Sequence, residues 1–421
     1  MKKSAFGERF TRPSGIGRLM EDLGDALGRE DMLMLGGGNP ARVPAVEEAL
    51  RPFLREQLDR PGGFGALVGD YDEPAGHLPF REALAELLSE RFGRPLTARN
   101  IALTHGSQSA FFILFNLFAG KMPDGSRRRI LLPLTPEYIG YADLGLEPDL
   151  FTACKPRIEP LDDHLFKYRV DFAALETSPP DIGAVCVSRP TNPTGNVLTD
   201  EEIERLDRFA RARGIPFLID SAYGTPFPDI IYTGARPFWN ENTVVCLSLS
   251  KFGLPALRTG IVVAREEIVE AVAAVNGVTA LAPGGFGPRL VEPIVRSREI
   301  LRLSCERIRP FYRERAETAL DAFRDALSAA GVPFRIHRPE GAFFLWIHFP
   351  GLPRPSAELY RRLKERGLVV VPGEYFFFGL EETWPHSREC LRVSYARPAE
   401  EIVAAARLLA DEVRRLFRSD G

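Results

Sequence analysis

Short apolar runs alternate with helical stretches between about residues 98 and 265. The apolar runs cover residues 100–104, 129–132, 182–188, 215–220, 244–250 and 260–264. Stretches with helical periodicity separate them, for example Ser107 to Phe118 and Asp200 to Arg213. The runs are apolar almost throughout, as is typical of strands buried on both faces of a sheet. This alternation predicts an α/β fold built on a large, doubly wound, mostly parallel sheet.

The pattern changes after about residue 295. An arginine-rich amphipathic stretch runs from Arg296 to Ala330, and short strand and helix patterns follow it at residues 334–337, 341–349, 356–366, 368–371 and 391–395. These elements indicate a smaller α+β domain. The first 50 or so residues have no sheet pattern of their own and are expected to join it. We therefore predict a large domain over residues 55–300 and a small domain formed by residues 1–54 and 301–421.

Composition and charge exclude several classes of protein. Of the 421 residues, 45% are hydrophobic and 26% are charged, which is typical of a globular protein. The net charge of −3 gives no reason to expect nucleic-acid binding. The five cysteines are scattered, and no signal peptide or membrane-spanning run is recognisable, so we predict a cytoplasmic protein that does not contact a membrane. The histidine spacing predicts no metal site, and no P-loop or dinucleotide fingerprint is present.

Lys251 follows one of the apolar runs, with Ser248 three residues before it and Arg258 seven residues after it. A lysine amine can form a Schiff base with a carbonyl cofactor, above all pyridoxal 5'-phosphate (PLP). Hydroxyl and guanidinium groups nearby would suit the phosphate of such a cofactor. Taken alone, a lysine at this position is more typical of a surface residue, so the interpretation depends on other segments.

Asp220 ends the apolar run 215–220, and Tyr223 comes three residues later. In open α/β sheets, ligands bind outside the carboxyl ends of the strands. A carboxylate there can keep the pyridine nitrogen of PLP protonated, and a phenol beside the O3′ atom lowers the pKa of a Schiff base. A strand-end aspartate considered alone is more often the cap of the next helix.

Two further turns fit the same cofactor. Ser188 to Gly195, with the sequence SRPTNPTG, places Asn192 after a predicted strand, where its amide can donate to O3′ or to a substrate carboxylate. Gly106, Ser107 and Gln108 join a predicted strand to an apolar helix, whose first N–H groups can hold a phosphate. The alternatives are a turn without a ligand and a simple helix cap.

Two more side chains are candidates for ligand binding. Arg392 lies in the strand-like run 391–395, where a buried guanidinium needs an anionic partner and a bidentate fork suits an α-carboxylate. Tyr138 is a candidate for stacking on the pyridine ring. The alternatives are a structural ion pair for Arg392 and a packed loop aromatic for Tyr138.

Together these motifs resemble one family over nearly the whole chain. Their order is similar to that of the fold-type I PLP-dependent aminotransferases of classes I and II: Y-x-x-x-x-G (71–76), G-S-Q (106–108), N-P-T-G (192–195), D-x-x-Y (220–223), S-x-S-K (248–251), Arg258 and Arg392. Each motif is weak alone, but seven in this order are specific. The resemblance implies a ping-pong transamination with PLP as the cofactor.

The resemblance also implies a role for each matching residue. Lys251 would hold PLP and then move the proton between the reacting carbons, Asp220 would hold the pyridinium, and Tyr223 and Asn192 would bind O3′. The phosphate would be bound at Gly106, Ser107, Gln108, Ser248 and Arg258, and Tyr138 would stack on the ring. The substrate carboxylate would be bound by Arg392, Asn192 and the Gly38 N–H. Tyr71 matches a tyrosine that crosses to the partner's phosphate, which implies a homodimer with shared active sites.

Further segments resemble one subgroup of the family, at residues 10–16, 34–41, 106–117, 136–142, 188–197 and 281–285. This implies exchange of an amino group between L-valine, or a related small or branched aliphatic amino acid, and pyruvate. No second arginine is clearly placed for a distal carboxylate, which disfavours aspartate and glutamate. Ile16 is a candidate to touch the substrate side chain, with ordinary packing as the alternative. In an apolar pocket, two substrates that differ by one methylene differ in binding free energy by only about 1–3 kcal/mol, so several related amino acids can serve as substrates.

Three alternative functions use the same motifs or the same fold. A PLP lyase or decarboxylase would use the same Lys251 and Asp220 and release ammonia or CO₂ instead of an oxo acid. An aminotransferase of another specificity, for alanine, aromatic or other branched-chain amino acids, is also compatible with the motifs. The aminotransferase-like half of a transcription regulator is disfavoured, because the family match begins by about residue 10 and leaves no room for a DNA-binding domain.

Overall fold

A computed structural model describes residues 1–12, 17, 24 and 32–419 of the chain. Within these residues, the larger sheet has eight strands in the order β2-β11-β10-β9-β8-β4-β3, with β5 paired to β4. Neighbouring strands are parallel from β10 through β9 and β8 to β4 and β5, whereas β11 and β3 run antiparallel to their neighbours. The α/β fold with a mostly parallel sheet is therefore confirmed.

The strands of this sheet lie close to the predicted runs. They are β2 (Ile101–His105), β3 (Gly120–Lys121), β4 (Arg127–Leu132), β5 (Phe151–Ala153), β8 (Ile182–Ser188), β9 (Phe217–Asp220), β10 (Thr243–Ser248) and β11 (Thr259–Val263). Every residue of β8, β9, β10 and β11 is buried. Such burial requires helices on both faces of the sheet.

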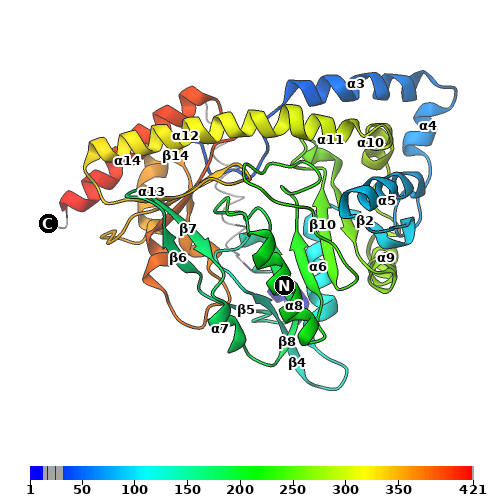
Figure 1. Cartoon of the computed structure of the whole chain (residues 1–421), viewed down its shortest axis with the longest axis horizontal. Coiled ribbons are helices and arrows are strands. Elements are labelled where there is room, and N and C mark those ends of the chain that lie inside the picture. Colours follow the sequence, from blue (N-terminus) through cyan, green and yellow to red (C-terminus); the bar gives the residue numbers. More distant parts are fainter. Residues whose placement is uncertain (13–16, 18–23, 25–31, 420–421) are drawn as a thin grey trace.

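Alternate strand residues pack into two different cores. Ile130, Leu218 and Cys246 point to the face covered by α6 (Ser107–Phe118) and α9 (Glu266–Ala280). Leu131 and Ile219 point to the opposite face, which is covered by α5 (Leu78–Phe92), α8 (Asp200–Ala212) and α10 (Phe286–Arg296). In Figure 1, these helices surround the sheet in the right half of the molecule. The sequence of α8 begins with a capping box, in which Thr199 and Glu202 satisfy each other's backbone N–H groups.

The second sheet has six strands in the order β15-β16-β13-β12-β7-β6. They are β6 (Arg157–Pro160), β7 (Leu165–Arg169), β12 (Arg335–His337), β13 (Phe344–His348), β15 (Val371–Pro372) and β16 (Cys390–Ser394). The strands β6 and β7 lie inside the range predicted for the large domain, yet they pair with this sheet. The division of the chain into two domains stays a prediction. Residues 157–169 do not follow it, because they lie in the large-domain range but belong to the second sheet.

Helices and the amino-terminal segment complete the region around the second sheet. They are α12 (Arg309–Ala330), α13 (Ser356–Glu365) and α14 (Ala399–Ser419), and Figure 1 shows α12 and α14 side by side. Strand β1 (Leu33–Met34) pairs in parallel with β14 (Leu368–Val369), as expected for an amino-terminal segment that joins the smaller region. The remaining helices are α1 (Ala5–Phe10), α3 (Pro44–Asp59), α4 (Gly63–Val68), α7 (Phe172–Glu176) and α11 (Glu299–Leu303).

The arginine-rich stretch expected from Arg296 to Ala330 is not one regular helix. Arg298 has a left-handed backbone conformation, and residues 304–308 form a π-helical turn between α11 and α12. Pro310 follows at once and has no N–H to continue the regular hydrogen-bond pattern. The amphipathic periodicity of this segment gave no sign of the break.

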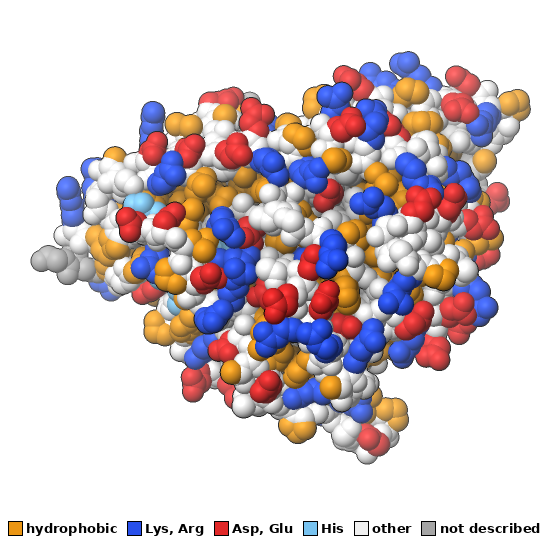
Figure 2. Space-filling view, in the orientation of Figure 1, with side chains coloured by type: hydrophobic (Ala, Val, Ile, Leu, Met, Phe, Trp, Pro, Cys, Tyr) orange, Lys and Arg blue, Asp and Glu red, His pale blue; other side chains and the backbone are white. Residues whose placement is uncertain are grey.

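The distribution of charge on the surface and the hydropathy of the helices are as the composition of the sequence predicts. Figure 2 shows acidic and basic side chains interspersed over the visible face of the molecule. Among the described residues, no helix has the length and apolar character needed to cross a membrane.

Candidate active site

A cavity of about 700 Å³ opens at the carboxyl ends of the large sheet's parallel strands, where the smaller region meets them. This is the place where open α/β sheets bind ligands. Many of the predicted site residues lie in its wall: Gly38, Ser107, Gln108, Tyr138, Asn192, Asp220, Tyr223, Ser248, Lys251, Arg258 and Arg392. Segments as distant as residues 38 and 392 thus meet around one space.

Lys251 lies just after β10, and its Nζ atom donates a hydrogen bond of 2.7 Å to the carbonyl of Gly38. The ammonium also lies 5.4 Å from the centre of the Tyr223 ring and 5.6 Å from that of Phe343. Burial lowers the pKa of Lys251 to about 8, with the charge of Arg392 acting in the same direction. A lysine of this kind is partly uncharged near neutral pH, as a nucleophile or base must be.

Asp220 ends β9 and is buried. Its Oδ1 accepts a hydrogen bond of 2.9 Å from the Ala222 N–H, and its Oδ2 accepts one from the Tyr141 hydroxyl. Burial raises the pKa of Asp220, whereas these hydrogen bonds and the charge of Lys251 lower it. The carboxylate is therefore held in one orientation and can accept a further hydrogen bond from a ligand.

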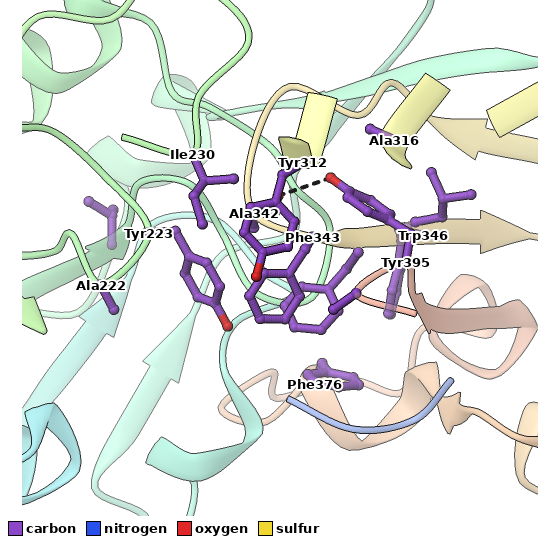
Figure 3. Close-up of a cluster of buried hydrophobic side chains, with 14 of the residues drawn as sticks. Ala222, Tyr223, Ile230, Tyr312, Ala316, Ala342, Phe343, Trp346, Phe376 and Tyr395 are labelled. Atoms are coloured by element: carbon purple, nitrogen blue, oxygen red, sulfur yellow. Dashed lines mark hydrogen bonds between the residues drawn. The ribbon is translucent and has the colours of Figure 1, made fainter. Parts of the chain in front are cut away.

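Tyr223 is the first member of a row of aromatic rings. Figure 3 shows the Tyr223, Phe343 and Tyr312 rings in succession. The centres of Tyr223 and Phe343 are 5.1 Å apart in an edge-on arrangement, and those of Phe343 and Tyr312 are 5.3 Å apart in a stack. The Tyr312 hydroxyl accepts a hydrogen bond from the Ala41 N–H, which ties the amino-terminal segment to the cavity. This packing fixes the phenol of Tyr223 in the cavity wall.

The amino terminus of α6 and Arg258 form a cradle with the character of an anion site. Gly106 precedes the helix with a φ of +85°, and a Cβ atom there would overlap the Arg258 guanidinium. A Cβ on Gly260 would come within 2.5 Å of the Gly106 carbonyl carbon and 2.6 Å of the Ser107 nitrogen. Within the described chain, no acidic side chain pairs with Arg258. Free helix N–H groups and an unpaired guanidinium together suit a phosphate.

Arg392 is buried on β16 between two aromatic rings. Its guanidinium carbon lies 4.4 Å from the centre of Phe344 and 5.2 Å from that of Phe376. One Nη donates to Asn192 Oδ1 at 2.8 Å, and the other donates to the Gly36 carbonyl at 2.6 Å. The Nε–H has no hydrogen-bond partner among the described residues. Burial lowers the pKa of Arg392 to about 10. No described carboxylate neutralises it, so the site calls for an anionic ligand.

Some predicted residues take other positions. The Gln108 amide donates to the Gly140 carbonyl at 2.7 Å, and the Tyr138 ring packs edge-on against Tyr141, 5.2 Å between centres. Gly38 offers its carbonyl to Lys251 in this structure, while the prediction concerned its N–H. Tyr71 is 83% exposed and does not line the cavity of its own chain. Ile16 lies outside the described residues.

Sequence reasoning missed several residues of the cavity. Arg315 on α12 lines it, held by a 2.5 Å hydrogen bond to the Arg397 carbonyl and by the face of Phe311. No described acidic side chain forms an ion pair with Arg315. That no second arginine is placed for a distal carboxylate stays a prediction, and Arg315 is the residue on which it depends. Arg315 lies in an arginine-rich amphipathic stretch, where nothing in the sequence distinguishes it from its solvated neighbours.

Tyr141 and Glu137, which lie behind the cavity, and Ser188 in its wall were also missed as a group. Tyr141 and Glu137 flank the predicted Tyr138 in the segment PEYIGY, and Ser188 begins the loop of Asn192. Their pairing with Asp220 and with each other joins segments about 50 to 80 residues apart. The signal that the sequence offered was the position of these polar residues next to two predicted site motifs.

One group of possible metal ligands lies in the second sheet, away from this cavity. Among the described residues, His348, His386 and Glu389 have donor atoms within 4.8 Å of one another. His348 Nε2 is hydrogen-bonded to Glu389 Oε2 at 2.8 Å, and His386 Nε2 to the Tyr168 hydroxyl at 2.5 Å. These atoms already satisfy one another, so the group needs no ion to explain it.

Comparison with known proteins gives a consistent result. A model of the family "Aminotransferase class I and II" matches residues 65–409. The valine–pyruvate aminotransferase of Escherichia coli (strain K12) is 49% identical over 99% of this chain and 99% of its own. The solved valine–pyruvate aminotransferase from Salmonella typhimurium LT2 is 47% identical, with a TM-score of 0.88 over 96% of this chain and 100% of its own. A solved protein from Psychrobacter arcticum 273-4, assigned as an amino-acid aminotransferase, is 45% identical with a TM-score of 0.96 over 99% of both chains.

Proposed function

Because the chain belongs to the class I and II aminotransferase family, we propose that it transfers the amino group between L-valine and pyruvate, giving 2-oxoisovalerate and L-alanine. The chain is an aminotransferase. Its similarity to the valine–pyruvate aminotransferase of Escherichia coli over 99% of both chains supports the choice of substrates. Amino acids that differ from valine by one methylene would compete with it, since an apolar pocket separates them by only about 1–3 kcal/mol.

The residues around the cavity fit PLP, the cofactor of this family. The cradle of Gly106, Ser107 and Arg258 suits its phosphate, and Lys251 offers an amine to its carbonyl. When bound, PLP supplies an electron sink that stabilises negative charge at the substrate Cα. Asp220 would accept a hydrogen bond from the pyridine nitrogen and keep it protonated. Tyr223 and Asn192 lie in the same wall and would donate to O3′, and Tyr138 would stack on the ring.

Lys251 would act as the base and acid of the reaction. After the substrate amine displaces it from the cofactor, its Nζ would take the proton from the substrate Cα and return a proton to the adjacent cofactor carbon. Its pKa of about 8 supports this role, because both charge states are accessible near neutral pH. The Gly38 carbonyl, which accepts a hydrogen bond from Nζ, would hold the freed amine at the edge of the cavity.

Arg392 would bind the carboxylate shared by amino and oxo acids. Asn192 and Gly36 already hold two of its nitrogens, and the free Nε–H is available for a ligand. The Phe344 and Phe376 rings beside the guanidinium would exclude water from it and limit its movement. Arg315 is a further arginine in the cavity wall, which favours testing a dicarboxylic oxo acid as an alternative acceptor.

The proposed assembly is a homodimer with shared active sites, in the cytoplasm. Tyr71 projects from the surface, and the exposed apolar side chains Phe64, Val68, Leu281 and Phe286 support burial against a second chain. Tyr71 would then reach the phosphate of the partner's cofactor. Sedimentation velocity tests the dimer, and loss of PLP affinity in Tyr71→Phe tests the contact.

The observation that carries the proposal is the meeting of Lys251, Asp220 and Arg392 around one cavity in a chain 49% identical to a valine–pyruvate aminotransferase. The test is an assay with PLP, L-valine and pyruvate in which both products are quantified. We expect equal amounts of L-alanine and 2-oxoisovalerate, and none with Lys251→Ala. Release of ammonia or CO₂ in place of these products would favour a lyase or decarboxylase instead.

A further inference from the structure

Glu137 is a buried carboxyl group that the proposed mechanism does not use. It lies in the turn after β4, and no cation of the described chain pairs with it. Its Oε1 accepts a 2.8 Å hydrogen bond from the Ser188 N–H, and its Oε2 lies 2.5 Å from Ser188 Oγ and 3.2 Å from the Tyr138 nitrogen. A buried carboxyl without a counter-ion is costly to keep, so its position next to the active site calls for an explanation.

Ser188 connects this carboxyl to the cavity. It lines the cavity wall, and in the sheet its Cα is the register partner of Asp220. When Glu137 is ionised, the Ser188 hydroxyl donates to it and turns its lone pairs toward other partners. When Glu137 is protonated, it can donate to Ser188 Oγ, which frees the serine proton for the cavity.

We propose that Glu137 is a positioning residue of the aminotransferase reaction: through Ser188, it determines whether the cavity wall beside Asp220 offers a hydrogen-bond acceptor or a donor. An acceptor there suits the protonated pyridine nitrogen that Asp220 would hold, so the ionised form of Glu137 is the active one. The effect on turnover rests on the proposed function. The Glu137–Ser188 pair itself rests on the structure alone.

The surroundings of Glu137 let it change its charge near neutral pH. Burial raises the pKa of Glu137 to about 8, against the hydrogen bonds from Ser188 and Tyr138, and the charge of Asp220 raises it further. Glu137 in turn raises the pKa of two titratable neighbours, the Tyr141 phenol and the Cys186 thiol. Burial raises the pKa of both, so they stay neutral and Asp220 is the charged neighbour.

Infrared spectroscopy of the PLP-loaded protein without substrate tests the pair directly. Between about pH 6 and pH 10 we expect the C=O band of a protonated carboxyl to disappear with a midpoint near 8. The band should be absent from Glu137→Gln. It should be present in the control Glu412→Gln, which changes a buried glutamate of α14 that pairs with Arg366. A band that survives in Glu137→Gln, or no such band in the wild-type protein, would overturn the proposal.

The pH profile of turnover separates positioning from simple structural support. Wild-type kcat should rise about tenfold as Glu137 ionises. The glutamine of Glu137→Gln donates an N–H to Ser188, just as the protonated acid donates its O–H, so the kcat of this variant should stay low at every pH. Ser188→Ala keeps the glutamate and should retain the infrared band but lose this rise. An unchanged rise in Ser188→Ala contradicts the proposal. Absence of valine–pyruvate turnover with the band intact would reject the proposed substrates and leave the Glu137–Ser188 pair standing.

Discussion

The hydroxyl of Tyr141 donates a hydrogen bond to Oδ2 of Asp220, and both side chains are buried. Burial raises the pKa of the phenol well above its usual range, so Tyr141 remains a hydrogen-bond donor near neutral pH. The bond opposes the effect of burial on Asp220 and favours its ionised form. Tyr141 therefore maintains the negative charge that the proposed mechanism requires of Asp220.

Replacing Tyr141 by phenylalanine should weaken cofactor binding. The substitution removes one hydrogen bond to a buried carboxylate, worth about 1.5–3 kcal/mol, and so raises the pKa of Asp220. We expect the Kd for PLP to rise about tenfold or more, measured by fluorescence titration of the cofactor-free protein. Tyr232→Phe, which removes a half-buried phenol that bonds to Ala342 and Tyr395, is the control and should leave the Kd unchanged. An unaltered Kd in Tyr141→Phe would show that Ala222 alone suffices to hold Asp220.

Arg392→Lys should weaken the binding of both substrates. A lysine ammonium cannot keep the hydrogen bonds to Asn192 and Gly36 and also form a fork with a carboxylate. KM should rise about tenfold or more for the amino acid and the oxo acid alike, in steady-state kinetics. Arg42→Lys is the matched control, because Arg42 lines the cavity but is paired with Glu47. If KM changed for one substrate only, Arg392 would not be the shared carboxylate site.

Gly106→Ala should damage the phosphate cradle more than the fold. The new Cβ would overlap the Arg258 guanidinium, and the φ of +85° adds backbone strain. Gly93→Ala carries similar strain, with a φ of +65°, but its Cβ would meet nothing within 4 Å. Both variants should lose about 1 kcal/mol of unfolding free energy, measured in urea. A large loss of PLP affinity is expected for Gly106→Ala alone, and equal affinities in the two variants would place the phosphate elsewhere.

Capture of PLP by the cofactor-free protein should accelerate with pH. The uncharged amine of Lys251 is the nucleophile, and its pKa lies at about 8 because burial disfavours the ammonium. The uncharged fraction, and with it the capture rate, rises as pH increases through this value and levels off above it. Stopped-flow absorbance measures the rate. Because the pKa of Glu137 lies in the same range, the variant Glu137→Gln separates the two groups: the midpoint of the capture rate should be unchanged in it if Lys251 is the group that titrates. A midpoint near 10, typical of an exposed lysine, would contradict the burial of Lys251.

Motif order and strand ends were enough to predict much of the candidate site. Asp220, Ser248 and Ser188 each end an apolar run, and parallel strands bring such ends to one edge of a sheet. Arg392 stood out as a candidate for binding a substrate carboxylate because it interrupts an apolar strand, and that role stays a prediction. The large sheet followed from the same runs, whose burial on both faces leaves a strong hydrophobic signal.

Other features left no local signal in the sequence. The short strands β6 and β7 are half-polar, and β7 joins the second sheet by pairing with β12, whose residues lie about 170 positions away. Strand β6 is held there through its pairing with β7. Arg315 resembles its solvated neighbours until α12 is placed beside the cavity. The bonds of Tyr141 to Asp220 and of Glu137 to Ser188 join different strand ends, so only the folded chain reveals them.

The most direct test of the central claim is a visible absorption spectrum of the PLP-loaded protein, titrated first with L-valine and then with pyruvate. The titration should show both half-reactions in turn. Valine should remove the absorption band of the Lys251-bound cofactor, and pyruvate should restore the band with formation of L-alanine. A band that does not respond to valine would contradict the proposed substrate while leaving the cofactor site in place. A protein that gains no such band on addition of PLP would contradict the account of Lys251 itself.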